Sequence, residues 1–136
     1  MPLLLFMIKI GAIGDIILGD HPLYYGIGVR SRIEKYHRNP FEFVAPVLKQ
    51  YDIVIGNLET VLSDKKMAKK NYYSFQMRGR KDFTSFLKEA GINVVNIANN
   101  HILQHGFEAM EETIELLKKN NIHVVGITEG NKELLK

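Results

Sequence analysis

Four short apolar runs recur along this chain, and segments with helical periodicity separate them. The runs are Met7–Ile13, Asp52–Gly56, Ile92–Ala98 and Ile122–Ile127. Apolar runs of this length are typical of strands that are covered on both faces. Strands that alternate with helices favour parallel pairing through right-handed helical crossovers. The sequence therefore predicts one α/β domain over residues 1–136, in which layers of helices pack on parallel strands.

The strongest helix signal follows the long segment after the first run. Asn39 is a favoured N-cap residue, Pro40 suits the first helical position, and Glu42 stands where a capping box needs it. We expect this helix to run to about Gln50. Its predicted buried stripe consists of Phe43, Val44, Val47 and Leu48.

Two further helices are expected, one before the third run and one before the fourth. Asp82 is a favoured cap for the earlier helix, and Gly91 suits its C-terminal cap in the left-handed conformation. The residues expected to face inward are Phe83, Phe86 and Leu87 in this helix, and Phe107, Met110, Ile114 and Leu117 in the later one.

The remaining segments are predicted to be irregular. Residues 15–38 contain several glycines and predict a long loop with one helical turn near Arg32 to Lys35. The segment Leu62–Lys70 carries four lysines and predicts a solvated loop. The alternating aromatic and polar residues of Tyr72–Met77 predict a short extended segment.

Composition narrows the possible chemistry. The chain has no cysteine, which excludes disulfides, thiolate metal sites and a cysteine nucleophile. Any metal must then be held by oxygen and imidazole donors. The 18 basic and 15 acidic residues give a formal net charge of +3, which is too small to predict a nucleic-acid partner, and we expect none.

The candidate site consists of the polar residues that follow the four runs, because ligands bind outside the carboxyl ends of parallel strands. Carboxylate, amide and imidazole groups suit a borderline divalent metal with open positions for water and a phosphate oxygen. Histidine titrates near neutral pH, which suits His101 to the role of general acid. The candidates are Asp15; Asn57 and Glu59; Asn99, Asn100 and His101; and Thr128 and Glu129.

Structural explanations compete with these functional ones. Asp and Asn often cap helices and tighten turns after strands. Gly11–Gly14 is a weak match to a nucleotide-binding glycine loop, because the third glycine and a prompt helix are missing. The apolar start Met1–Ile8 is interpreted as an edge or first strand, with a trimmed signal anchor as the alternative, and no signal-peptide cleavage site follows it.

Four motifs resemble, in order and spacing, the CapA-like poly-γ-glutamate capsule biosynthesis family. They are Gly14–Gly19, Asn39–Phe43, Asp52–Thr60 and Ala90–His101, and they span most of the chain. That family belongs to the calcineurin-like metallophosphoesterase superfamily. The resemblance is to the amino-terminal half of such a domain, so it implies a metallophosphoesterase-type fold that is apparently incomplete.

The resemblance implies roles for particular residues. Carried over to this sequence, the metal ligands are Asp15, Asn57, Glu59 and Asn100, and the general acid of phosphoester hydrolysis is His101. The implied cofactor is a divalent metal, with Mn, Zn or Fe as the expected ions. The sequence departs from the superfamily at Ile17, where a histidine ligand is usual, and at Asn57, where aspartate is usual.

The resemblance also implies a function in the synthesis of a capsule or cell-envelope polymer such as poly-γ-glutamate. The expected substrate is an anionic polymer or a phosphoester, and the expected partner is a membrane-associated capsule machinery. The family suggests a location at the cell envelope, although the sequence shows no signal peptide. Two other functions stay open, namely a non-catalytic partner in polymer assembly or export and a nucleotide-binding module.

Overall fold

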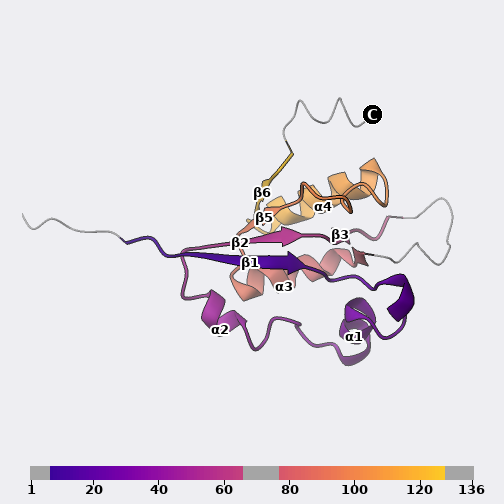
Figure 1. Ribbon diagram of the computed structural model, residues 1–136, viewed down its shortest axis with the longest axis horizontal. Coiled ribbons are helices and arrows are strands. Elements are labelled where there is room, and N and C mark those ends of the chain that lie inside the picture. The colour runs from indigo at the N-terminus through magenta and orange to yellow at the C-terminus, as the bar shows by residue number, and fades with distance from the viewer. Residues whose placement is uncertain (1–6, 66–76, 128–136) are drawn as a thin grey trace, which may run out of the picture.

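The computed structural model describes residues 7–65 and 77–127, and it contains a four-stranded parallel sheet (Figure 1). The strands, in spatial order, are β1 (Ile10–Ile16), β2 (Ile53–Leu58), β5 (Val94–Asn96) and β6 (His123–Val125). The predicted α/β class is confirmed. The sheet and its helices are consistent with part of a metallophosphoesterase-type domain.

Helices connect the successive strands of this sheet. α1 (Val29–Tyr36) and α2 (Ala45–Leu48) lie between β1 and β2, α3 (Thr84–Ala90) precedes β5, and α4 (Phe107–Lys119) precedes β6. Short 3-10 helices occupy Pro22–Tyr24 and Lys81–Phe83. A second, two-stranded parallel sheet pairs β3 (Val61–Leu62) with β4 (Arg78–Gly79).

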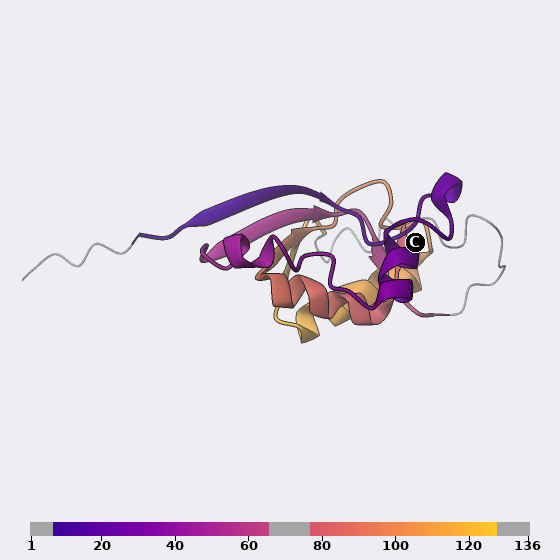
Figure 2. The same ribbon diagram turned by 90° about the horizontal axis from the view of Figure 1, so that it is seen from below.

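The helices α3 and α4 cover one face of the four-stranded sheet, and the other face is open in the described residues (Figure 2). Successive side chains of a strand point to opposite faces. Val54 and Val95, on the covered face, are 0% exposed, whereas Ile10, on the open face, is 64% exposed. The prediction that the first strand is covered on both faces is therefore wrong, because β1 is an edge strand with one open face.

Strand β1 carries one extra residue relative to β2. Ala12 pairs with Ile55 and Asp15 pairs with Asn57, so three steps along β1 match two along β2. The resulting bulge turns Asp15 to the open face and returns Ile16 to the core. The strand thus continues past Gly14, where it was predicted to end. The glycine-loop interpretation is also wrong, since Gly11–Gly14 lies inside the strand.

The helix predicted to run to about Gln50 is reduced to α2. Pro46 explains the difference, because a proline inside a helix lacks the N–H and clashes with the carbonyl four residues earlier. The helix therefore begins at Ala45, which places Pro46 in its first turn. Most of the predicted stripe is wrong: Phe43 is 81% exposed, and Leu48 is its one buried member.

Helix α1 lies where a long loop with a single helical turn was predicted. Its N-terminus is capped by the carboxylate of Asp20, which is 2% exposed. This carboxylate accepts hydrogen bonds from the Ser31 N–H, at 3.2 Å, and from the Ser31 hydroxyl. Because Asp20 lies 11 residues before Ser31, no local capping pattern predicts this helix.

Other predicted element ends are partly confirmed. Gly91 ends α3 with a φ of 84°, as a left-handed cap does. Asp82 does not cap that helix, which begins at Thr84 with Phe83 at the N-cap position; the Asp82 carboxylate accepts a hydrogen bond from Arg80 Nε at 3.2 Å. Leu62 is buried in β3, so the loop predicted to begin there begins later. Residues 66–76, which hold most of the lysine-rich and extended segments, lie outside the described residues.

Two phenylalanine truncations test where the core lies. Phe83→Ala should lower the free energy of unfolding by about 3–5 kcal/mol, because the ring is buried and leaves a cavity. Phe43→Ala should change it by less than about 0.5 kcal/mol, because that ring is exposed. Urea unfolding followed by circular dichroism measures both. A large loss of unfolding free energy for Phe43→Ala would support the longer helix, with Phe43 buried, that the sequence predicted.

Candidate functional site

Three polar side chains form a row across the carboxyl ends of β1, β2 and β5. Asp15 is the register partner of Asn57, and Asn57 is the register partner of Asn96. The three residues lie on the open face of the sheet, where strand alternation and the bulge in β1 place them. The carboxyl ends of these strands therefore present a continuous polar row to solvent.

Asn57 is the centre of a hydrogen-bond network. Its Nδ2 donates to Asp15 Oδ1 at 2.8 Å and to Glu59 Oε1 at 3.4 Å. Its Oδ1 accepts from the Nδ2 atoms of Asn96, at 3.0 Å, and Asn99, at 3.2 Å. The amide thus uses both of its donor protons and both acceptor lone pairs. The reversed orientation is disfavoured, because it would bring three NH2 groups together.

Buried contacts hold the ends of β1 and β2 side by side. Thr60 is 0% exposed, and its Oγ1 accepts a hydrogen bond from the Leu18 N–H at 2.7 Å. The Glu59 N–H donates to the Ile16 carbonyl at 3.2 Å. These two bonds fix the backbone at and beside Glu59, so its half-buried carboxylate stays beside the row.

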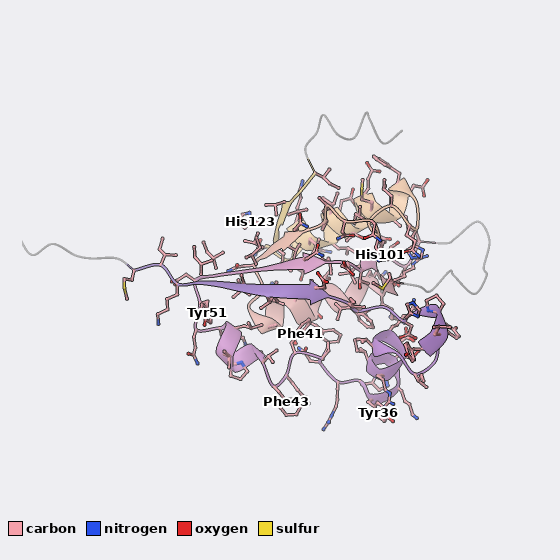
Figure 3. All side chains as sticks on the ribbon, viewed as in Figure 1. Tyr36, Phe41, Phe43, Tyr51, His101 and His123 are labelled. Carbon is pink, nitrogen blue, oxygen red and sulfur yellow. The ribbon has the colours of Figure 1, made fainter. Side chains whose placement is uncertain are left out.

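The turn after β5 carries His101, which lies near the carboxyl ends of the strands (Figure 3). Asn99 Oδ1 accepts from the His101 N–H at 3.1 Å, and Asn99 Nδ2 donates to the Leu58 carbonyl at 2.9 Å. His101 Nδ1 lies 2.8 Å from Gln104 Oε1, and Nε2 lies 3.3 Å from Asn100 Nδ2. An oxygen beside Nδ1 and an amide donor beside Nε2 assign the proton of a neutral ring to Nδ1.

A buried arginine holds the small β3–β4 sheet together. Arg78 is 5% exposed, and it donates from Nε to the Ser63 carbonyl at 2.9 Å and from Nη2 to the Lys65 carbonyl at 2.5 Å. Burial lowers the pKa of this guanidinium, and the positive charge of Arg30 lowers it further. Arginine nevertheless stays charged at neutral pH. Arg78 thus serves the packing of β3 and β4 and not the polar row.

The cluster fits a divalent ion only in part. Asp15 and Glu59 supply carboxylate oxygens, which hard divalent ions prefer. Across residues 7–65 and 77–127, no three His, Asp or Glu side chains gather closely enough to hold a metal ion. Asn57 presents N–H groups to both carboxylates. The groups available to hold an ion are therefore the two carboxylates beside Asn57.

The structure brings three of the predicted ligands together, namely Asp15, Asn57 and Glu59. Asn100 and His101 contact each other in the next turn, and Asn99 links that turn to Asn57. The metal-binding and acid roles proposed for these residues stay predictions. Residues 128 and 129, the last candidates, lie outside the described residues.

Asn96 is a member of the network that sequence reasoning missed. It lies inside the third apolar run, which predicts a strand there and no site residue. Strand alternation could have identified it, because Asn96 is a polar residue near the carboxyl end of that run, on the face opposite the buried Val95.

Comparison with known proteins identifies the family. Residues 9–134 match the family described as "Bacterial capsule synthesis protein PGA_cap". The chain belongs to this family. The resemblance inferred from the four motifs is thus confirmed.

Individual relatives agree with this assignment. The chain is 32% identical over 125 residues to the "Capsule biosynthesis protein CapA" of Bacillus anthracis, covering 90% of this chain and 29% of the relative. It is 27% identical over 114 residues to the "PGA biosynthesis protein CapA" of Bacillus subtilis (strain 168), covering 84% and 28%. The chain therefore spans less than a third of the length of these relatives.

Truncation of Asn57 tests its place in the network. Asn57→Ala removes the acceptor of Asn96 Nδ2 and one acceptor of Asn99 Nδ2, so it should lower the free energy of unfolding by about 1–3 kcal/mol. The matched variant Asn100→Ala removes an exposed amide and should cost less than about 0.5 kcal/mol. Chemical denaturation measures both. Equal losses of unfolding free energy in the two variants would show that the hydrogen bonds of Asn57 contribute no more to stability than an exposed amide does.

Proposed function

We propose that this chain acts in the synthesis of a capsule polymer, and that its strand-end cluster forms one wall of a divalent-metal site for phosphoester hydrolysis. The observation that supports this proposal is the approach of Asp15 and Glu59 to the same amide group of Asn57. Two carboxylates beside one another, one exposed and one half-buried, repel each other and attract a divalent cation.

Each residue has a defined part in the proposed site. Asp15 and Glu59 would hold the ion, which when bound acts as a Lewis acid on a phosphoryl oxygen. Asn57 orients the two carboxylates, and Asn96 and Asn99 orient Asn57. Asn100 lies beside His101 Nε2, where it can position the ring or bind a substrate oxygen. In its doubly protonated form, His101 would give the Nε2 proton to the leaving oxygen.

The substrate and partners are proposed from the relatives. The name of the Bacillus subtilis relative refers to PGA, which suggests poly-γ-glutamate as the anionic polymer whose synthesis this chain serves. The expected partner is a capsule machinery associated with a membrane at the cell envelope. Among the described residues, no helix is both long enough and apolar enough to cross a bilayer.

A second candidate is a non-catalytic partner in polymer assembly or export. One observation favours it: the amide group of Asn57 already donates one hydrogen bond to Asp15 and one to Glu59. The cluster can then serve as a structural network or as a polar contact surface. Metal affinity separates the two candidates.

Titration with Mn²⁺ by isothermal calorimetry tests the proposed metal site. The unchanged chain should bind the ion, and Asp15→Asn or Glu59→Gln should weaken binding by more than the roughly tenfold that loss of an outer-shell partner costs. Glu108→Gln is the matched control, because Glu108 is an exposed carboxylate in the first turn of α4. Absence of binding by the unchanged chain would leave the non-catalytic function.

Hydrolysis of bis(p-nitrophenyl) phosphate tests the role of His101. His101→Asn should lower kcat by about 10²–10⁴-fold without changing Mn²⁺ affinity, because general acid catalysis contributes that much. His123→Asn removes an exposed histidine of β6 and should leave the rate unchanged. A parallel loss of rate and of metal affinity would make His101 a ligand and not the acid.

A further inference from the structure

Large exposed apolar side chains lie in the segment that leads into α1 and at the last residue of that helix, Tyr36. Single exposed apolar side chains are normal on a protein surface, but a contiguous group of them usually marks an interaction site. The exposed fractions are 78% for Leu23, 58% for Tyr24, 52% for Tyr25, 63% for Ile27 and 51% for Tyr36. Two hydrogen bonds of the turn, from the Tyr24 N–H to the His21 carbonyl and from the Ile27 N–H to the Tyr24 carbonyl, hold this segment in shape.

A groove of about 500 Å³ adjoins two of these residues, Ile27 and Tyr36, on the face of α1 that carries the buried Ile33. Its walls are largely apolar and include Ile27, Val29, Tyr36 and Pro40. Two arginines, Arg32 and Arg38, also line it, and no acidic side chain is among the described residues of its lining. The groove therefore combines an apolar interior with positive charge.

The positive charges lie close to aromatic and apolar groups. The Arg32 guanidinium carbon is 6.0 Å from the Tyr36 ring centre, and Lys35 Nζ is 5.2 Å from it. Arg38 lies 3.9 Å from the Glu42 carboxylate, in a pair whose arginine side chain is 73% exposed, so this contact neutralises little of its charge. The charges of Arg32, Lys35 and Arg38 thus remain available to an anionic partner.

We propose that this surface docks the protein on an anionic lipid bilayer. Tyrosine rings sit favourably at the boundary between headgroups and acyl chains. Aliphatic side chains enter the acyl region, while arginine and lysine bind the phosphates. The positive charge beside the apolar groups is the property that selects an anionic membrane over a neutral surface. The members of this docking surface are Leu23, Tyr24, Tyr25, Ile27, Arg32, Lys35, Tyr36 and Arg38.

The docking surface shares no residue with the strand-end cluster. Tyr36 lies at the outer margin of the molecule on α1, and His101 lies beside the ends of the strands (Figure 3). The inference goes beyond the proposed function, and variants of this surface leave Asp15, Glu59 and His101 in place. Metal binding and hydrolysis therefore report on the strand-end cluster, and vesicle binding reports on the docking surface.

Vesicle sedimentation with the full chain tests the proposal. The chain should bind vesicles that contain about one part phosphatidylglycerol to two parts phosphatidylcholine, and should bind pure phosphatidylcholine much more weakly. Arg32→Gln with Arg38→Gln should reduce affinity for the anionic vesicles about 25-fold, at roughly fivefold for each charge. Leu23→Ser with Ile27→Ser should also reduce it, and added salt should weaken binding of the unchanged chain.

Matched controls separate the docking surface from general charge and apolarity. Lys118→Gln with Lys119→Gln removes the same charge from the last turn of α4, and Met7→Ser with Ile8→Ser removes similarly exposed apolar groups; both should bind as the unchanged chain does. Equal losses in the controls, or no preference for anionic vesicles, would overturn the proposal. Self-association that Leu23→Ser with Ile27→Ser abolishes, without vesicle binding, would overturn it too and assign the surface to a second copy of the chain.

Discussion

The bulge in β1 decides where the polar cluster forms. If β1 had kept the register that it has at Ala12, Gly14 would pair with Asn57 and Asp15 would point into the core. An unpaired carboxylate there would carry a large desolvation cost. The extra residue avoids that cost, because it sends Asp15 to the open face and buries Ile16 instead. One local irregularity thus determines both the core and the site.

The sequence predicted the parts of the fold that local patterns encode. The four strands, α4 and the left-handed cap at Gly91 follow from apolar periodicity and from the backbone freedom of glycine. Helix α1 escaped prediction because its cap, Asp20, is distant in sequence. The helix after Asn39 was predicted too long because a capping pattern was weighed without Pro46, which forbids an earlier start.

The site was predicted in the same uneven way. Chain position alone grouped Asp15, Asn57 and Glu59, because parallel strands end at one edge of a sheet. The direction of the Asn57 amide could not be foreseen, since it depends on Asn96 and Asn99 from a different strand and turn. The bulge before Asp15 was equally hidden, because Gly14 has no side chain whose burial the pattern could reveal.

The orientation of Asn57 bears directly on how an ion would be held. Metal ligation by its oxygen would require the amide to reverse, and the reversed NH2 group would then face the NH2 groups of Asn96 and Asn99. All four hydrogen bonds of the Asn57 amide would be lost, each worth about 1 kcal/mol. The carboxylates of Asp15 and Glu59 can turn to an ion by giving up only the bonds from Asn57. The network therefore favours ligation by the two carboxylates, with Asn57 as the group that positions them.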